Sequence, residues 1–250
     1  MSPDQLSGTT ALVTGASRGL GRGVAIAMAH AGATVIGVAR DHGRLAELHT
    51  ELGDRFIPVA ADAADPVTAG KLMDKYVPRL LVLAAGSAPL SRPLHHQTWQ
   101  TFSRNWDVDV QQVFNWTREA LLRPLEPGSV VIAFSSGAVL AGSPLSGGYA
   151  GAKATIRYIT SYASDESDRS GLGIRFASVL PQLTHATDLG AAAVAAYAAR
   201  AGQDVADFIA SRGPALTPDI AGKAVLELAT AAGSTANAYL LSAAGLKELQ

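Results

Sequence analysis

The sequence contains no cysteine among its 250 residues. Disulfide bonds, thiolate metal sites and a cysteine nucleophile are therefore excluded, and the composition fits a reducing compartment. The chain also lacks an excess of either charge, because 20 Lys and Arg stand against 21 Asp and Glu, for a formal net charge of −1. Without a basic surface for nucleic acid or a polybasic membrane anchor, we expect a small molecule as the partner.

Long hydrophobic runs and linkers are missing as well. The longest apolar candidate, "AAAVAAYAA" at 191–199, falls far short of the ~20 residues that span a bilayer. The opening "MSPDQLSGTT" has neither the basic nor the apolar region of a secretory signal. No proline-rich or charged stretch divides the chain. We expect a cytoplasmic protein without membrane contact, folded as a single domain over 1–250.

Apolar, β-rich runs alternate with segments of helical period. Such alternation is typical of a parallel sheet that is covered by helices on both faces. The pattern predicts a doubly wound α/β fold with a mostly parallel, seven-stranded sheet. The predicted strands are 9–15, 33–40, 56–62, 80–86, 128–136, 174–180 and 237–243, and the main predicted helices are 21–32, 43–52, 98–122 and 149–167. Sheets of this kind bind ligands at the carboxyl ends of their strands, where the strand order reverses.

A glycine-rich turn joins the first predicted strand to the first helix. In "LVTGASRGLGRG", Gly15, Gly19 and Gly21 fall between the two elements. A phosphate can rest on a helix N-terminus only where the backbone turns tightly and no Cβ blocks its approach. A flexible strand-to-helix turn is the alternative. The position between a strand and a helix favours a nucleotide site.

A tyrosine and a lysine, Tyr149 and Lys153, are one helical turn apart in "YAGAK" and share one face of a helix. Reduction of a ketone by hydride requires a proton for the developing alkoxide. A free tyrosine phenol, with a pKa of roughly 10, is too weak an acid to supply it efficiently. A neighbouring ammonium stabilises the phenolate. Ser136 follows the fifth strand and offers a hydroxyl to the carbonyl oxygen. Taken alone, the spacing of Tyr149 and Lys153 is also typical of a surface helix, and a serine such as Ser136 is also common in an ordinary loop.

The glycine turn and the "YAGAK" segment together resemble the short-chain dehydrogenase/reductase family, in its shorter form. The resemblance implies a Rossmann domain and hydride transfer between a nicotinamide and a carbonyl or secondary alcohol. It implies that Tyr149 is the acid or base and that Ser136 binds the substrate carbonyl. It also implies that Lys153 lowers the pKa of the tyrosine and binds the nicotinamide ribose. Many relatives form dimers or tetramers through the two long helices around strands four and five, so we expect a homodimer or homotetramer.

The resemblance also implies a set of cofactor-binding residues. They are Gly15, Ser17, Arg18, Gly19, Leu20, Gly21, Arg40, Asp62, Ala63, Ala85, Gly86, Tyr149, Lys153, Pro181 and Thr184. Two guanidiniums, Arg18 and Arg40, favour the 2′-phosphate of NADP(H) over NAD(H). Asp41 is the alternative, because its carboxylate could hold a ribose hydroxyl and make NAD(H) possible. Asp62 matches a position that contacts adenine, although it also fits a capping aspartate.

The sequence departs from the family at several places. Leu83 and Ala84 replace two asparagines after strand four, and Pro181 is followed by Gln182 instead of glycine. The threonine expected shortly afterwards is Thr184 or Thr187.

A further departure concerns the proton relay. A family asparagine that relays protons to the lysine aligns with Asp109, and Asn105, one turn earlier, is the alternative relay residue. Each also fits an ordinary polar position on a helix face.

The stretch 184–218 is rich in alanine, with Tyr197 and Phe208 as its large aromatics. It predicts a helical lid over an apolar pocket, although helical spacing favours plain packing over substrate contact for either aromatic. His95 and His96 lack a third ligand at metal spacing, so no metal is assigned. The sequence predicts an oxidoreductase. A nucleotide-binding sensor or scaffold with little turnover is the rival, motivated by the departures from the family.

Overall fold

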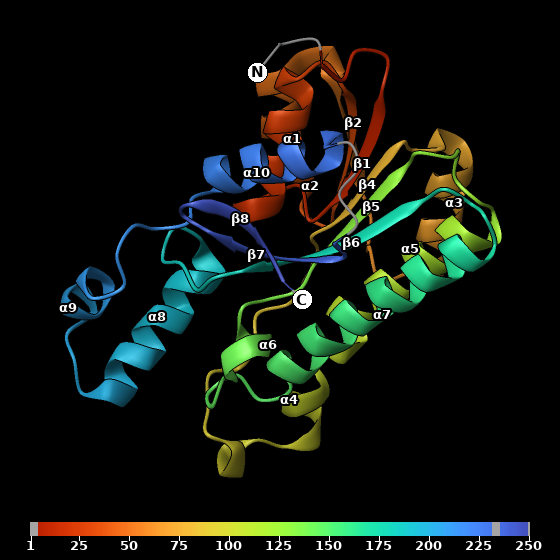
Figure 1. Ribbon diagram of the computed structural model, residues 1–250. Helices are drawn as coiled ribbons and strands as arrows, with labels where there is room; N and C mark the ends of the chain where they lie inside the picture. Colours follow the sequence, from red (N-terminus) through yellow and green to blue (C-terminus); the bar gives the residue numbers. More distant parts are fainter. Residues whose placement is uncertain (1–4, 232–235, 250) are drawn as a thin grey trace.

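The computed structural model describes residues 5–231 and 236–249, which form an eight-stranded sheet with helices on both faces (Figure 1). The spatial order of the strands is β3-β2-β1-β4-β5-β6-β7-β8. Their bounds are β1 (Thr10–Thr14), β2 (Thr34–Ala39), β3 (Phe56–Ala60), β4 (Leu80–Leu83), β5 (Val130–Phe134), β6 (Arg175–Pro181), β7 (Ala238–Ser242) and β8 (Gly245–Glu248). The doubly wound α/β fold expected from the sequence is confirmed.

The strand count differs from the seven predicted. The first seven strands pair in parallel, and β8 adds an antiparallel eighth strand at the edge, with Leu246 opposite Leu241. Its sequence, "GLKE", has one large apolar residue and two charged ones. Charged side chains are usual on exposed edge strands, which need no apolar alternation. The periodicity that identifies the buried strands is therefore absent from β8.

Successive residues of each central strand point to opposite helical layers. Val13 packs in one core cluster with Val24 of α1 and Val225 of α10, whereas Leu12 packs with Trp116 of α5 and Ile156 of α7. Figure 1 shows α1, α2 and α10 on one face and α3, α5 and α7 on the other. The bounds are α1 (Gly19–His30), α2 (His42–Leu52), α3 (Pro66–Tyr76), α5 (Gln111–Leu122), α7 (Tyr149–Arg169) and α10 (Pro218–Thr230).

Helices α1 and α10 approach each other backbone to backbone. A Cβ on Gly23 would lie 2.0 Å from the carbonyl oxygen of Pro218, and one on Gly222 would lie 2.3 Å from that of Gly23. Both glycines are needed because no side chain fits between the helices. This contact holds α1, the helix behind the glycine turn, firmly against the body of the fold.

The helix predicted over 98–122 is divided into three parts, which corrects the sequence-based prediction. It consists of α4 (Trp99–Ser103), a π-helical turn η3 (Trp106–Val110) and α5. Such wide turns are rare in proteins, and those that occur are often found at functional sites. Within η3, Asp109 is buried while Asp107 is exposed, so the turn carries a carboxylate into the interior at the carboxyl end of β4.

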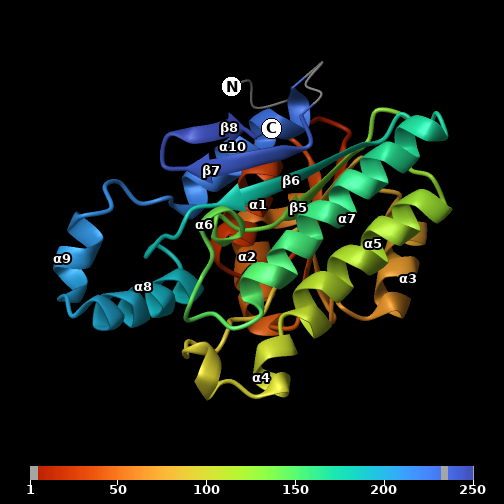
Figure 2. The same ribbon diagram turned by 60° about the horizontal axis from the view of Figure 1, so that its bottom comes forward.

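Most of the remaining elements gather near the carboxyl ends of the strands. They are the short helix α6 (Ala138–Ala141), the 3₁₀ turn η2 (Leu94–His96), and the helices α8 (Asp188–Ala201) and α9 (Val205–Ala210). The 3₁₀ turn η1 (Gly53–Arg55) instead precedes β3, at the amino end of that strand. Figure 2 shows α8 and α9 projecting away from the two helical layers. No helix in the described ranges is both long and apolar enough to cross a membrane.

Candidate active site

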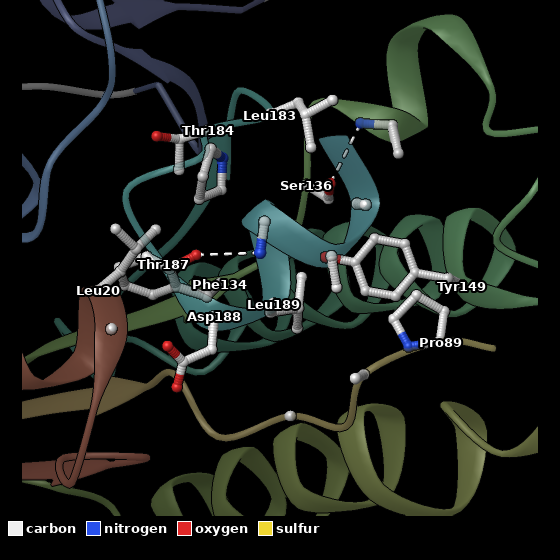
Figure 3. A pocket seen from close by; sticks show the side chains of 18 of the residues that line it. Leu20, Pro89, Phe134, Ser136, Tyr149, Leu183, Thr184, Thr187, Asp188 and Leu189 are labelled. Atoms are coloured by element: carbon white, nitrogen blue, oxygen red, sulfur yellow. Dashed lines mark hydrogen bonds between the residues drawn. The ribbon is translucent and has the colours of Figure 1, made fainter. Parts of the chain in front are cut away.

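A cleft of about 1980 Å³ lies at the carboxyl ends of the parallel strands. It borders the boundary between β1 and β4, where the strand order reverses and ligands of this fold bind. Every residue that the sequence predicts for the site lines this cleft, except Asn105, the alternative relay residue. Figure 3 shows Ser136 and Tyr149 on one side, across from Leu20 and Asp188.

The glycine turn has the geometry of a phosphate cradle. Gly15 and Gly19 adopt left-handed backbone angles of φ 71° and 57°, and a Cβ on Gly21 would lie 2.4 Å from the carbonyl oxygen of Gly15. Helix α1 begins after Arg18 without a side-chain cap, so its first N–H groups remain available beside the cleft. Uncapped N–H groups at a helix start bind anions. Ser17 and Leu20 line the cleft on the same turn.

Helix α7 presents the tyrosine and lysine together. Tyr149 is its first residue and half-buried, and the Nζ atom of Lys153 lies 5.5 Å from the centroid of the tyrosine ring. Lys153 is buried, with 6% of its surface exposed. Its Nζ donates a hydrogen bond to the carbonyl oxygen of Phe134 at 3.0 Å. The ammonium is thus fixed at the end of β5, next to the phenol.

Two serines follow β5 and have different contacts. The hydroxyl of Ser135 donates to the carbonyl oxygen of Lys153 at 2.7 Å, which ties β5 to α7. The hydroxyl oxygen of Ser136 accepts a hydrogen bond from the N–H of Ala138 at 3.2 Å. Because this bond uses the oxygen of Ser136 as acceptor, its O–H remains able to donate to a substrate. Ser135 has a structural contact, and Ser136 has the donor that the chemistry requires.

Asp109 forms a buried ion pair with Lys153. Its Oδ2 atom lies 3.1 Å from the lysine Nζ, and the two side chains are 1% and 7% exposed. Its Oδ1 atom accepts from the N–H and hydroxyl of Ser87 at 2.7 and 3.3 Å. Burial lowers the pKa of Lys153, but the Asp109 carboxylate and the Tyr149 phenolate outweigh burial and hold this pKa above its ordinary value. The lysine therefore stays charged at neutral pH.

Asn105, the alternative relay residue, has a different contact. Its amide donates to the carbonyl oxygen of Ser87 at 2.7 Å and to the Ser87 hydroxyl at 3.0 Å. It thereby holds the loop after β4 to the start of η3. Of the two candidates, Asp109 is the one that pairs with Lys153.

Gln112 supplies an amide beside the backbone that follows β4, and sequence reasoning missed it. The hydroxyl of Thr14 donates to its Oε1 at 2.9 Å, while its Nε2 donates to the carbonyl oxygen of Ala85 at 3.0 Å. The Thr14 hydroxyl oxygen accepts from the N–H groups of Ala84 and Ala85. This network fixes the backbone at Ala85 and Gly86, which line the cleft. Leu83 and Ala84 lack the two side-chain amides that the resemblance leads one to expect, and this lack could have prompted a search for another amide nearby.

The adenosine end of the cleft holds Arg40, Asp41 and Asp62, all of them exposed. Asp41 caps α2, accepting from the N–H of Arg44 at 3.1 Å, and its second oxygen lies 3.5 Å from the guanidinium of Arg44. Asp62 accepts from the N–H of Ala64 at 2.9 Å, the capping contact that the sequence also allowed. Next to it, Ala63 accepts a hydrogen bond from the indole of Trp116.

Both candidate threonines after β6 serve local hydrogen bonds. Thr184 donates to the carbonyl oxygen of Leu216 at 2.8 Å and accepts from the N–H of Ala186. Thr187 caps α8 by accepting from the N–H of Gly190. Pro181 accepts a hydrogen bond from the N–H of Gly137 at 2.8 Å, which joins the loops after β5 and β6. All three residues border the cleft.

The substrate side of the cleft is formed by α6, α8 and α9. Its lining is largely apolar and includes Leu140, Leu189, Tyr197 and Phe208. The hydroxyl of Tyr197 hydrogen-bonds to that of Ser143, which links α8 to the loop before α7. Among the described residues, no group of three His, Asp or Glu side chains is arranged to hold a metal ion.

Comparisons with known proteins bear on the family of the chain. A family model described as short chain dehydrogenase matches residues 9–198. The chain is similar to an uncharacterized short-chain type dehydrogenase/reductase of Sinorhizobium fredii, with 33% identity over 68% of each chain. It is also similar to a probable NADP-dependent dehydrogenase of Haemophilus influenzae, with 32% identity over 72% of this chain and 73% of the relative.

A solved structure, that of 3-ketoacyl-(acyl-carrier-protein) reductase from Brucella melitensis complexed with NADH, is similar with 25% identity and a TM-score of 0.73. The match covers 90% of this chain and 91% of that one. The family model spans well over half of the chain, and the resemblance drawn from the motifs is confirmed. The chain belongs to the short-chain dehydrogenase/reductase family.

Proposed function

We propose that the protein transfers hydride between NADP(H) and the carbonyl or secondary alcohol of a small, apolar substrate. The observation that carries this proposal is the placement of the Tyr149 phenol beside the buried ammonium of Lys153, with Ser136 on the same side of the cleft. This is the arrangement that protonation of a developing alkoxide requires.

Each residue has one chemical task in this proposal. The bound cofactor supplies or accepts the hydride at C4 of its nicotinamide. Ser136 donates a hydrogen bond to the carbonyl oxygen, and Tyr149 gives it a proton during reduction or removes one during oxidation. Lys153 holds the nicotinamide ribose and stabilises the phenolate. Asp109 neutralises part of the lysine's charge, and so acts on the tyrosine through Lys153.

The residues of the cleft fit a nicotinamide dinucleotide. The uncapped start of α1 and the glycines around it suit the pyrophosphate. Arg18 and Arg40 suit a 2′-phosphate, whereas both carboxylate oxygens of Asp41 are engaged with Arg44. The Haemophilus influenzae relative, named as NADP-dependent, supports the preference for NADP(H). The NADH complex of the Brucella melitensis reductase keeps NAD(H) as the alternative.

The apolar lining supports the proposed substrate class, and α8 and α9, within 184–218, are proposed as its lid. We also propose a homodimer or homotetramer built on α5 and α7. These helices lie side by side in Figures 1 and 2, and their outer face exposes Phe114, Leu122 and Tyr162 around a groove of about 530 Å³. The molar mass in solution, measured for the wild type and for Tyr162→Glu, tests this assembly.

A panel of ketones and secondary alcohols, with NADPH and NADH followed optically, tests the proposed activity. We expect turnover of at least one apolar carbonyl compound, and faster turnover with NADPH. Failure to bind either cofactor would contradict the proposal. Tight NADPH binding without turnover on the whole panel would instead favour a nucleotide sensor or scaffold.

A further inference from the structure

Two arginines from different elements converge on one carboxylate at the adenosine end of the cleft. The Nη1 atom of Arg18, in the glycine turn, lies 3.9 Å from Oδ2 of Asp188. The Nη1 atom of Arg44, in the first turn of α2, lies 3.8 Å from the same oxygen. The three side chains are 60%, 44% and 75% exposed. Asp188 therefore lies within ion-pair distance of two guanidiniums at the surface, while the Nε atom of Arg44 also lies 3.5 Å from Oδ2 of Asp41.

The carboxylate is brought there by the start of α8. Asp188 is the first residue of that helix. The preceding residue, Thr187, approaches the glycine turn so closely that its Cγ2 lies 3.6 Å from where a Cβ of Gly19 would be. Figure 3 shows Asp188 on the side of Leu20, away from Tyr149. The anion thus stands at the cofactor end of the cleft and not at the end where the carbonyl reacts.

Two convergent guanidiniums form a geometry that recognises phosphate. A phosphate monoester carries −1.5 to −2 charges and three acceptor oxygens. The Asp188 carboxylate has a single charge, and one of its oxygens serves both arginines. A phosphate placed between Arg18 and Arg44 would make stronger contacts than Asp188 and would displace it.

We propose that Asp188 is an internal competitor for the 2′-phosphate of NADP(H), holding Arg18 and Arg44 until that phosphate takes its place. The inference rests on the proposed NADP(H) function. It adds Arg44 to Arg18 and Arg40 as a third arginine for the 2′-phosphate. It also adds Asp188 as a residue that sets cofactor discrimination. NAD(H) has no 2′-phosphate and so does not compete for this pair of arginines. Asp188 accordingly weakens NADPH binding selectively.

The test is calorimetric and independent of turnover. Dissociation constants are measured for NADPH and 2′,5′-ADP, which carry the 2′-phosphate, and for NADH and ADP, which lack it. For Asp188→Asn we expect NADPH and 2′,5′-ADP to bind about three to ten times more tightly, as the loss of exposed ion pairs implies. NADH and ADP should change by less than about twofold. Equal gains for both pairs of ligands, or no gain, would overturn the inference.

Asp219→Asn is the matched control. Asp219 is also in the first turn of a helix, α10, and pairs with Lys223 at 2.8 Å, outside the cleft. Its substitution changes the net charge and the helix start in the same way. We expect no change in the four dissociation constants, and a gain equal to that of Asp188→Asn would show a bulk charge effect and contradict the competition.

A double-mutant cycle with Arg44→Gln isolates the contact. If Asp188 acts through Arg44, the gain from Asp188→Asn shrinks when Arg44 is already removed. A full gain in that background would contradict the assignment. Failure of the wild type to bind any nicotinamide nucleotide would contradict the proposed function itself. Normal NADPH binding that is insensitive to Asp188 would contradict this inference alone.

Discussion

Asp109 Oδ2 and Lys153 Nζ lie 3.1 Å apart in the interior, with their side chains 1% and 7% exposed. The lysine beside Tyr149 is therefore not an isolated cation. Its ammonium is shared between the carboxylate of Asp109, the carbonyl oxygen of Phe134 and the tyrosine ring. This arrangement has consequences for the pH dependence of activity and for stability.

The pH dependence of alcohol oxidation should change in Asp109→Asn. Without the carboxylate, the full charge of Lys153 stabilises the tyrosinate that acts as base, so the alkaline-rising limb should move to lower pH. The observed limb belongs to the coupled network of Tyr149, Lys153 and Asp109. A pH–rate profile measures it, with Asp107→Asn, an exposed residue of the same turn, as control. If the limb does not move, Asp109 does not act on the tyrosine.

The stability of the fold should depend on the same pair. Asp109→Ala leaves the buried Lys153 charge without its carboxylate, and we expect a loss of about 3–5 kcal/mol in the free energy of unfolding. Asp109→Asn should cost less, because its amide oxygen can still accept from the Ser87 N–H. Denaturant titration measures both, and Asp107→Ala should remain close to wild type.

The sign of the pKa shift sets the pH window of this effect. The pKa of Lys153 is raised, so the stabilisation from its charge is fully present below the unfolded value of about 10.4. It is lost only as the pH rises through the folded-state pKa. In Asp109→Ala, burial without the carboxylate should lower the pKa of Lys153, so the difference in stability from the wild type should be largest at the acid end of the range from about pH 6 to 9 and should not grow as the pH rises. A difference that increases with pH over this range would contradict the assigned charges.

Cofactor preference should depend on Arg40. If its guanidinium binds the 2′-phosphate, Arg40→Ala loses a charged hydrogen bond worth about 1.5–3 kcal/mol, which raises the dissociation constant for NADPH by about ten- to a hundredfold. The constant for NADH should not change. Equal affinities of the wild type for the two cofactors would contradict the preference for NADPH. They would instead favour Asp41 as the residue that holds a ribose hydroxyl.

The glycine contact between α1 and α10 should tolerate no side chain. Gly23→Ala places a Cβ against the Pro218 carbonyl, and overpacking of this kind costs about 1–3 kcal/mol. Gly70→Ala is the matched control, since Gly70 lies in the interior of α3 and a Cβ there would be 3.8 Å from its nearest neighbour, Oε2 of Glu119. There we expect a gain of about 0.5–1 kcal/mol from the helix propensity of alanine. Thermal unfolding distinguishes the two, and equal effects would contradict the packing argument.

Local sequence pattern predicted the central strands and the Tyr149–Lys153 pair, because apolar runs and helical spacing can be recognised from residues that are close together in the sequence. The contacts that complete the site depend on residues far apart in the chain. Thr14 and Gln112 meet across 98 positions, and no local pattern connects them. The π-helical turn is equally hidden from a period of 3.6 residues, and it is what carries Asp109 to Lys153.

The central claim is that Tyr149 transfers the proton that accompanies hydride transfer. Single-turnover oxidation of bound NADPH by an accepted ketone, compared between the wild type and Tyr149→Phe, tests it most directly, with the NADPH dissociation constant measured for both. Because the phenol hydroxyl acts mainly in the transition state, we predict that hydride transfer is abolished while NADPH affinity stays nearly unchanged. Retention of more than a small fraction of the wild-type rate in Tyr149→Phe would contradict the account.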